Sequence, residues 1–312
     1  MNEIVLAADL GGTNLRMAAV DSDGKVLYRT GIETPRSENH KPIVASLIQL
    51  AIACREATKK DASVTAFGVA VPAIINTCGK IFNAPNLPEL NGLEFSSAIA
   101  SKIGVQVIVE NDATAAAIGE NWMGASRDFG SSICVTLGTG VGGGIVIDGK
   151  PLRGIDGTAG EIGHICVEPD GVKCGCGSFG CLEQYSSASA ITRMAVELRD
   201  RYPKSLLRNK TGLGPLDIFN AGKSGDALAI EVFRRVGYYL GIAFAGLVNV
   251  LNPEVIVIGG GASAGWELFI DEVLYEIRKR AFKQPAERVR VVRAELGDDA
   301  GILGAARLAL GK

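Results

Sequence analysis

The sequence predicts an α/β fold of two domains that are built on one plan. Its 312 residues are enough to bury two hydrophobic cores. Short apolar runs typical of strands alternate with longer helical stretches, an order that favours helices packed on mainly parallel sheets. A unit of strand, glycine-rich loop, strand and Asp-Gly-Lys turn occurs twice, and an internal repeat of this kind indicates two related domains.

The first copy of this unit lies at the beginning of the chain. Ile4–Ala8 is a short apolar run that predicts a buried strand, and Asp9–Asn14 follows it as a glycine-rich loop. Leu15–Val20 predicts the second strand, and the turn Ser22–Gly24 leads into a third.

The second copy has the same elements in the same order. Ile133–Thr136 predicts its first strand, Leu137–Gly142 its loop and Gly143–Ile147 its second strand, before the turn Asp148–Lys150. The two copies match element by element, which is the basis for expecting two domains.

The remaining elements alternate between strand and helix. Two further strands are expected between the copies, and a helix-rich region with one strand is expected after them. The expected strands are Ala66–Pro72, Val105–Glu110 and Val255–Ile258, and the expected helices lie in Pro42–Lys60, Ala113–Met123, Ser187–Arg201, Gly225–Leu251 and Gly265–Phe282. We expect a first domain at 1–115 and a larger second domain at 116–299, with a C-terminal helix at about 300–312 that packs back on the first.

Composition argues against several classes of protein. The net charge is −2 and no block of Lys and Arg stands out, so no nucleic-acid partner is expected. Val236–Pro253 is uncharged, but its two asparagines and Pro253 leave an apolar part too short for a bilayer, so we expect a core helix and no membrane partner. Seven cysteines, an odd number, and Glu3 and Asp9 in place of a basic secretory segment predict a cytoplasmic protein.

The densest group of metal-ligand side chains lies within eighteen residues. His164, Cys174, Cys176 and Cys181 make a Cys₃His set, which suits a structural Zn²⁺ in tetrahedral geometry. Glycines between the cysteines let the backbone turn tightly. The same cysteines would also serve as a disulfide pair or as unpaired core thiols. Cys166 is expected to be a core thiol, with a place among the ligands as the alternative.

Both glycine loops are candidates for holding phosphate. Neither is a P-loop, because each joins two strands and lacks the lysine and the following helix. Backbone N–H groups still cradle a phosphate where glycine allows it to approach closely, although tight hairpin turns are the ordinary alternative. The residues concerned are Gly11, Gly12 and Thr13 in the first copy and Gly138, Thr139 and Gly140 in the second.

Asp9 lies at the end of the first strand, directly before the first loop. A carboxylate there would hold a magnesium ion that accompanies a bound phosphate, through water, because Mg²⁺ keeps much of its hydration. The alternative is an aspartate that bonds its own backbone in a turn. The second copy has Thr136 at the matching position, so the turn itself does not require a carboxylate.

Asn111 and Asp112 lie where an expected strand meets an expected helix. Both residue types are favoured at the N-terminal cap of a helix, which is the ordinary interpretation of the pair. A catalytic role for Asp112 depends on the resemblance that the cysteine-rich segment carries.

Gly163–Glu183 resembles the signature of the ROK family of sugar kinases and repressors. That pattern is Gly-His, six residues, Gly, two residues, then Cys-x-Cys-Gly-x-x-Gly-Cys-x-Glu, and every fixed position is met here. The paired loops resemble the phosphate loops of the actin, hexokinase and Hsp70 ATPase fold. Val255–Ser263 resembles the adenosine-binding element of that fold, which would place Gly259, Gly260 and Gly261 at the nucleotide; a buried strand and turn is the alternative.

The resemblance implies two actin-like (ribonuclease H-like) ATPase domains with an interdomain cleft. It implies a kinase that transfers the γ-phosphate of MgATP to the 6-hydroxyl of glucose, with Asp112 as the base that accepts the hydroxyl proton. One nitrogen of His164 would bind zinc, and the other would then be a fixed donor to the sugar. A homo-oligomer, dimer or tetramer, is also implied. The residues that would bind the sugar hydroxyls are Asn111, Asp112, Glu161, His164 and Glu183.

Other functions fit parts of the same pattern. Repressors of the family carry a helix-turn-helix domain before the first strand, and this chain enters its first expected strand at Ile4, so a kinase is expected. The acceptor could also be fructose, N-acetylmannosamine or N-acetylglucosamine, because carboxylates that bind hydroxyls serve several sugars. Polyphosphate as the donor and a sugar-binding protein without activity are the further alternatives.

Overall fold

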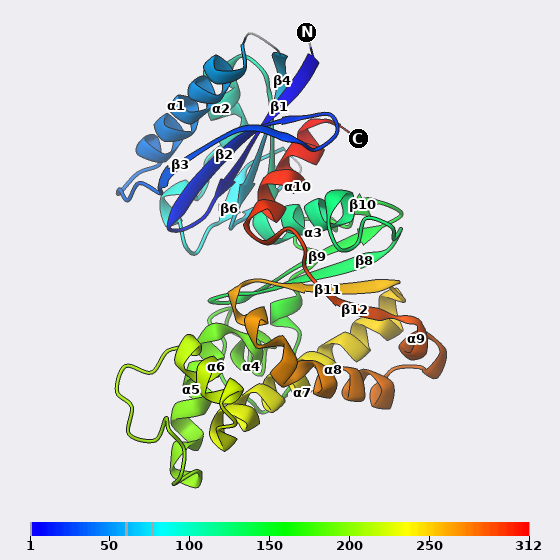
Figure 1. Ribbon diagram of the computed structural model, residues 1–312. Helices are drawn as coiled ribbons and strands as arrows, with labels where there is room; N and C mark the ends of the chain where they lie inside the picture. The colour runs from blue at the N-terminus through cyan, green and yellow to red at the C-terminus, as the bar shows by residue number, and fades with distance from the viewer. Residues whose placement is uncertain (1, 60–61, 77, 312) are drawn as a thin grey trace. The chain divides into compact units, whose positions relative to one another are not determined.

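The computed structural model describes residues 2–59, 62–76 and 78–311 (Figure 1). Contacts divide the chain into two compact units. Unit 1 comprises Met1–Cys134, Gly144–Gly160 and Ala294–Lys312, and unit 2 comprises Val135–Gly143 and Glu161–Arg293. This division differs from the boundary expected between residues 115 and 116. The expected domains at 1–115 and 116–299 stay a prediction.

The sheet of unit 1 has the strand order β3-β2-β1-β4-β7. Its first three strands form an antiparallel meander, and β4 and β7 continue from β1 as parallel neighbours. Because parallel strands end at the same edge of a sheet, the residues that follow β1, β4 and β7 gather at one edge. The strands are β1 (Asn2–Leu10), β2 (Asn14–Asp21), β3 (Val26–Glu33), β4 (Ala62–Val71) and β7 (Gln106–Asn111).

One face of this sheet is covered by α1 (Lys41–Thr58) and α2 (Phe95–Ile103). Their buried side chains, such as Leu47 and Phe95, join those of the strands in one hydrophobic cluster. The expected end of the first helix at Lys60 lies outside the described residues. α2 was not predicted, and its apolar face becomes clear only against the sheet.

The other face is covered by α3 (Asp112–Met123) and α10 (Ala300–Ala309), which also pack on each other (Figure 1). Glycine allows this close approach: a Cβ on Gly304 would lie 1.7 Å from the carbonyl oxygen of Ala115, and one on Gly68 would lie 2.0 Å from that of Ala305. The last helix of the chain is therefore fitted tightly against the sheet of unit 1.

The second sheet has the order β10-β9-β8-β11-β12. β9 and β10 pair antiparallel, and β11 and β12 pair parallel. Its topology repeats that of the first sheet, with three consecutive strands followed by parallel ones, as the sequence repeat predicts. The strands are β8 (Ser132–Leu137), β9 (Val141–Ile147), β10 (Lys150–Pro151), β11 (Val255–Gly259) and β12 (Arg290–Arg293).

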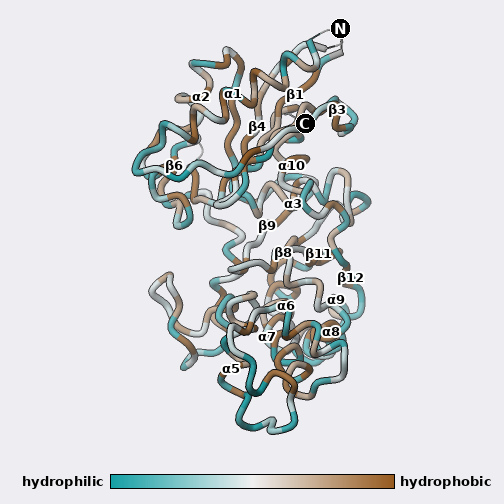
Figure 2. The backbone as a smooth tube through the Cα atoms, turned by 60° about the vertical axis from the view of Figure 1, so that its left-hand side comes forward, coloured by the Kyte–Doolittle hydropathy of each residue, from teal (hydrophilic) through white to brown (hydrophobic). Residues whose placement is uncertain are grey.

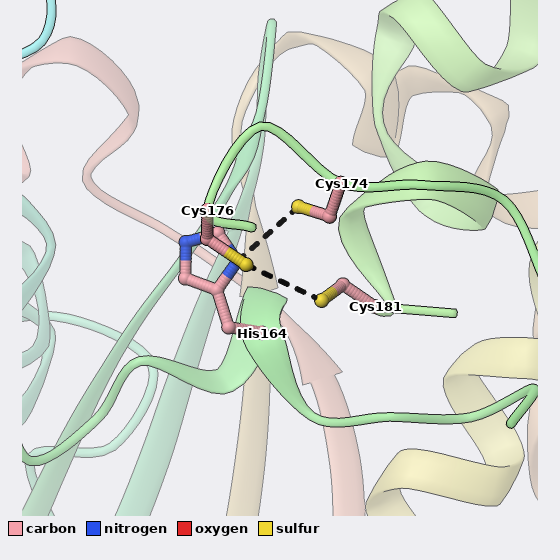
Figure 3. Close-up of side chains that lie close together, drawn as sticks. All are labelled: His164, Cys174, Cys176 and Cys181. Carbon is pink, nitrogen blue, oxygen red and sulfur yellow. Dashed lines mark hydrogen bonds between the residues drawn. The ribbon is translucent and has the colours of Figure 1, made fainter. Parts of the chain in front are cut away.

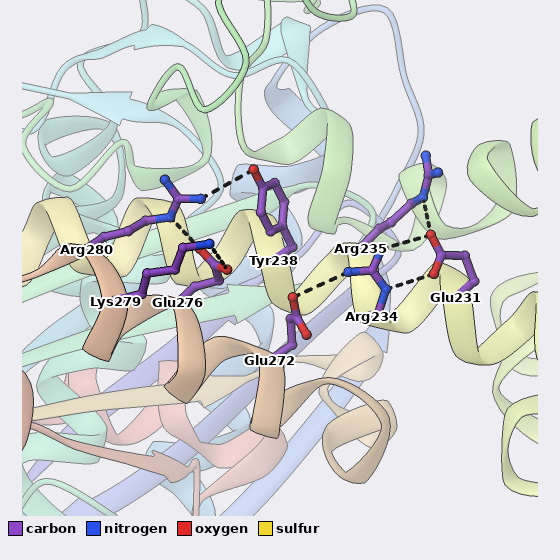
Figure 4. Close-up of polar contacts among 8 residues, drawn as sticks. All are labelled: Glu231, Arg234, Arg235, Tyr238, Glu272, Glu276, Lys279 and Arg280. Atoms are coloured by element: carbon purple, nitrogen blue, oxygen red, sulfur yellow. Dashed lines mark hydrogen bonds and ion pairs between the residues drawn. The ribbon is translucent and has the colours of Figure 1, made fainter.

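The longest helix, α7 (Ala227–Leu251), packs against α8 (Trp266–Arg280) in unit 2. Asp226 caps α7 by accepting from the backbone N–H groups of Leu228 and Ala229. A Cβ on Gly237 would lie 2.5 Å from the carbonyl oxygen of Phe269, so glycine sets the spacing of the two helices. Ion pairs along both helices, including buried Glu276 with Arg280 and Lys279, flank this contact (Figure 4).

Most of the uncharged stretch that begins at Val236 lies within α7, which ends at Leu251; Leu240, Phe244 and Val248 are fully buried there. The expected core helix is therefore confirmed. Among the described residues, no helix has both the length and the apolar character that crossing a membrane requires. Hydrophobic residues also concentrate along β1 and β4 (Figure 2).

The smaller elements complete the fold. They are β5 (Ile74–Ile75), β6 (Ile81–Asn83), α4 (Glu183–Ser186), α5 (Ala188–Leu198), α6 (Pro215–Lys223), α9 (Lys283–Arg288) and the 3₁₀ turns Pro88–Leu90, Ile162–His164, Arg199–Arg201, Gly261–Gly265 and Gly297–Asp299.

Candidate functional site

The Cys₃His set comes together in unit 2 (Figure 3). One ligand atom from each of His164, Cys174, Cys176 and Cys181 lies within 4.8 Å of the others. The sulfurs of Cys176 and Cys181 are 3.7 Å apart. Four sulfur ligands around a tetrahedral Zn²⁺ would be separated by roughly the same distance, about 3.7 Å, whereas a disulfide needs about 2.05 Å. The spacing and the donor chemistry therefore fit zinc and not a disulfide.

Local turns hold the cysteines in place. The backbone N–H of Cys174 donates to the carbonyl of Ser178, and that of Gly177 donates to the carbonyl of Cys174. Gly177 has a φ of 97°, which glycine adopts without strain. Burial raises the pKa of the Cys181 thiol to about 12, so this sulfur is protonated at neutral pH unless a cation lies beside it.

Cys166 does not belong to the ligand set and is exposed. The expectation of a core thiol was wrong. Its backbone pairs with that of Cys181 in an isolated antiparallel β-bridge. The pairing was not visible in the local sequence.

His164 ends the 3₁₀ turn Ile162–His164, and its two ring nitrogens face different groups. Nδ1 lies 3.7 Å from the sulfur of Cys174, and Nε2 lies 3.9 Å from a carboxylate oxygen of Glu161. The backbone N–H of His164 also donates to the carbonyl of Glu161. The structure therefore assigns Nδ1 to the thiol cluster and leaves Nε2 beside Glu161, an arrangement in which zinc would fix the ring orientation.

A second group of candidates lies at the carboxyl edge of the unit 1 sheet. Asp9 is next to last in β1, and Asn111 ends β7 directly before α3. Burial raises the pKa of Asp9 to about 6, with the charges of Asp112 and Asp298 adding to this effect and Arg16 opposing it. Asp9 and Asp112, more than 100 residues apart in the chain, are thus close enough to influence each other.

The sequence made both Asn111 and Asp112 candidates for the N-terminal cap of α3, and the structure gives the cap to Asn111. The side chain of Asn111 accepts from the backbone N–H of Thr114 at 3.0 Å and so caps α3. The side chain of Asp112 accepts from the N–H of Ala113 at 2.8 Å, at the first position of the helix. Because Asn111 is the cap, the carboxylate of Asp112 is not required for it.

The second glycine loop lies against Glu183, the first residue of α4. The N–H of Val141 donates to Oε2 of Glu183 at 3.1 Å, and a Cβ on Gly140 would lie only 2.3 Å from that oxygen. A Cβ on Gly138 would meet nothing within 4 Å. Contact with Glu183 therefore requires a glycine at Gly140, whereas packing does not require one at Gly138. The sequence motif did not distinguish the two positions.

The first loop is held from outside the repeat. The hydroxyl of Thr34 donates to the carbonyl of Gly11 at 2.7 Å, and the N–H of Thr34 donates to the carbonyl of Thr13. Arg36 donates to the carbonyl of Gly12. Neither Thr34 nor Arg36 was singled out from the sequence, because nothing in the local pattern links β3 to this loop.

The glycine run after β11 also separates into two kinds of residue. Gly260 has a φ of 84°, and a Cβ there would lie 2.5 Å from the carbonyl oxygen of Leu137 at the end of β8. Gly261 has open space around its Cβ position. Packing thus accounts for Gly260, while Gly261 remains a candidate for contact with a nucleotide.

Glu110 and Arg153 are a further pair that the sequence did not indicate. Arg153 Nε donates to buried Glu110 at 2.7 Å, and Glu110 also accepts from the N–H of Asn111. The pair holds the end of β7 directly before the candidate residues Asn111 and Asp112.

Comparison with known proteins identifies relatives along nearly the whole chain. It is 36% identical over 308 residues to a glucokinase of Halalkalibacterium halodurans, covering 96% of this chain and 92% of the relative. It is 33% identical over 309 residues to a glucokinase of Thermotoga maritima, covering 97% and 96%. A xylose repressor of Caldicellulosiruptor bescii is 30% identical over 307 residues, covering 96% of this chain and 76% of the relative.

Solved structures agree with these relatives. A ROK hexokinase of Thermus thermophilus has a TM-score of 0.85 at 30% identity, covering 98% of each chain. A ROK family glucokinase of Streptomyces griseus, in complex with glucose and AMPPNP, has a TM-score of 0.80 at 33% identity, covering 99% of this chain and 100% of that one. ROK sugar kinases have the actin-like two-domain fold, so the expected fold class is confirmed. The kinases among the relatives support a sugar kinase, and regulators occur among them as well. The ROK family model matches residues 5–312, and the chain belongs to the ROK family.

Proposed function

We propose that this protein is an ATP-dependent glucokinase, which transfers the γ-phosphate of MgATP to the 6-hydroxyl of glucose. The observation that carries the proposal is the placement of Asp9 and Asp112 at the carboxyl edge of one sheet, where their charges interact. One carboxylate would serve the magnesium of the nucleotide and the other the hydroxyl of the acceptor. The glucokinase relatives, which match nearly the whole chain, support glucose and ATP as the substrates.

In this mechanism the sugar O6 attacks the γ-phosphorus while the bond to the β-phosphate oxygen of ATP breaks. The proton of the 6-hydroxyl passes to the carboxylate of Asp112, and ADP leaves with its magnesium. Phosphoryl transfer has a loose transition state, so positioning and charge contribute more than the strength of the base. Asp112 suits the task because Asn111 already caps α3 and holds the helix end in place.

Asp9 would hold the magnesium ion through water. Its raised pKa, about 6, supports this role: burial and two neighbouring carboxylates disfavour its charged form, and a divalent cation would relieve that repulsion. The backbone of Gly11, Gly12 and Thr13, of Gly138, Thr139 and Gly140, and of Gly259, Gly260 and Gly261 would contact the nucleotide.

The sugar would be bound by hydroxyl contacts from several side chains. Asn111 and Glu161 would bind the 3-hydroxyl region, Asp112 the 4- and 6-hydroxyls, and His164 with Glu183 the 1- and 2-hydroxyls. Val141 already fixes the carboxylate of Glu183 in orientation, and Glu161 lies beside Nε2 of His164. A site of fixed polar groups rejects a sugar that leaves one of them unpaired.

A panel of sugars in a coupled assay for ADP tests this assignment. Glucose should have the highest kcat/KM, mannose should be the better tolerated epimer, and galactose should be poor, because its 4-hydroxyl points away from Asp112. Preference for galactose or for an N-acetylated sugar would reject glucokinase and keep the kinase. Sugar binding without phosphorylation of any sugar, from ATP or polyphosphate, would favour the sugar-sensing regulators that also occur among the relatives.

We also propose that the Cys₃His cluster holds one structural Zn²⁺, which supplies no chemistry to phosphoryl transfer but orients His164. Metal analysis should find about one zinc per chain. Cys176→Ser should lower zinc content, thermal stability and sugar affinity together. The matched control is Cys166→Ser, because this exposed cysteine lies outside the cluster. Full activity in a preparation shown to be free of zinc would contradict the proposal.

A further inference from the structure

Unit 1 contains a cavity that the proposed kinase reaction does not use. Its volume is about 450 Å³, large enough for a small organic molecule. The walls come from the second half of α3, the loop that follows it, the β9–β10 hairpin and the end of α10. Side chains that matter for its chemistry are Ile118, Trp122, Arg127, Asp128, Val146 and Arg307.

The cavity is separate from the candidate catalytic edge. Trp122 lies ten residues after Asp112 on the same helix, and a helix rises 1.5 Å per residue, so the two ends are about 15 Å apart. The cavity therefore lies at the far end of α3 from the proposed base.

Arg307 is the feature of this cavity that points to a ligand. Its guanidinium group lies 5.3 Å from the centre of the Trp122 ring, an interaction that orients it. Within the part of the chain that the structure describes, the side chain of Arg307 makes no ion pair or hydrogen bond with another residue. By contrast, Arg127 is paired with Glu295 at 2.7 Å, so its charge is already balanced.

The charge and polarity of the walls define the kind of ligand. Two arginines and a single aspartate, Asp128, are the charged side chains among the described residues that line the cavity, and Ile118 and Val146 provide apolar wall. Elsewhere in the lining, the N–H of Gly149 donates to the carbonyl of Gly130, and a Cβ on Gly149 would meet nothing within 4 Å. An anionic group paired with Arg307 and a partly apolar body would fit both features.

We propose that this cavity is a binding site for a small organic anion, a carboxylate or a phosphate ester, whose charged group pairs with Arg307. A bidentate contact of this kind is favoured by the planar geometry of guanidinium. The site is independent of the proposed function, because it shares none of the residues assigned to sugar, nucleotide or metal.

Trp122 lines the cavity, so its fluorescence reports binding at this site. The chain has two tryptophans, and Trp266→Phe leaves Trp122 as the only one. In this background phenyl phosphate and benzoate should change the fluorescence of Trp122 in a saturable way, and benzyl alcohol, which has no charge, should not. Failure of both anions to give a saturable change at millimolar concentrations would overturn the proposal.

Variants of Arg307 and Asp128 sharpen the result. Arg307→Gln should weaken phenyl phosphate binding by about tenfold or more, the effect of losing a charge-assisted hydrogen bond, and Arg307→Lys should weaken it less. Asp128→Asn should strengthen it, because it removes the negative charge at the cavity. Arg208→Gln is the matched control, since Arg208 is an exposed arginine of unit 2. Equal affinity in Arg307→Gln, at an unchanged thermal midpoint, would overturn the proposal.

A competition experiment separates this site from the nucleotide site. Saturating AMPPNP should leave the titration of Trp122 by phenyl phosphate unchanged. Loss of the signal when AMPPNP is added would place the anion at the nucleotide and would also overturn the proposal.

Discussion

The two copies of the strand–loop–strand unit have one backbone plan and different surroundings. In the first copy, Asp9 precedes the loop, and its pKa is raised by burial and by the nearby charge of Asp112. In the second copy, Thr136 takes the place of Asp9, and the charged neighbour of the loop is Glu183, which comes from α4. The repeat thus builds the same turn twice, while elements outside it bring different charged groups to each turn.

The repeated backbone unit alone therefore does not determine which charged groups lie beside each loop. Asp112 begins α3, and Glu183 begins α4, so each loop has a carboxylate delivered by the start of a helix. Only the first copy adds a carboxylate of its own, Asp9, which is the residue proposed to hold magnesium through water.

The largest expected effect is at the first copy. Asp112→Asn should keep the shape of the site and remove the proton acceptor, so kcat should fall by ~10²–10⁴-fold with sugar binding partly retained. Asp271→Asn is the control, because this aspartate is an exposed residue of α8 and is none of the residues proposed for the site. Steady-state kinetics of both variants checks this, and a near-normal kcat for Asp112→Asn would remove the residue from the mechanism.

The second effect concerns stability against pH without magnesium. The pKa of Asp9 is raised from 3.8 to about 6 in the folded protein, so the folded state binds this proton more tightly than the unfolded state. The resulting stabilisation is present below about pH 4 and is lost as the pH rises from about 4 to about 6. Asp9→Asn should therefore raise the free energy of unfolding at pH 7 by up to ~3 kcal/mol, at about 1.4 kcal/mol per pKa unit, and change it little at pH 4.

Urea unfolding at both pH values measures this effect. Thr136→Asn, at the matching position of the second copy, should show no such dependence. If wild type and Asp9→Asn lose stability equally between pH 4 and pH 7, the raised pKa of Asp9 does not distinguish the first copy from the second.

The smallest effect separates the two glycines of the second loop. Gly140→Ala should displace Glu183 and lose its bond from Val141, which costs about 1 kcal/mol and should lower sugar affinity. Gly138→Ala has open space, so it should weaken ATP binding while stability is kept. Thermal unfolding and separate titrations with glucose and ATP distinguish the two, and identical behaviour of both variants would show that the loop is only a turn.

Much of the fold was visible in the sequence because its signals are local. The strands of both copies, the loops between them and the core helix that contains Leu240 follow from short patterns of apolar residues and glycine. Four ligands within eighteen residues likewise predicted the Cys₃His cluster, since a short segment with glycines has few ways to keep them apart.

Tertiary structure decided what depends on distant parts of the chain. The placement of Asp9 and Asp112 at one edge of the sheet requires parallel pairing of β1, β4 and β7, and no local pattern contains that pairing. Long-range packing likewise left Cys166 exposed, set Glu183 beside Gly140 and placed Arg307 over Trp122. The physical reason is that a sequence pattern reports which face of an element is buried, whereas the partner of that face is chosen by the packing of the whole sheet.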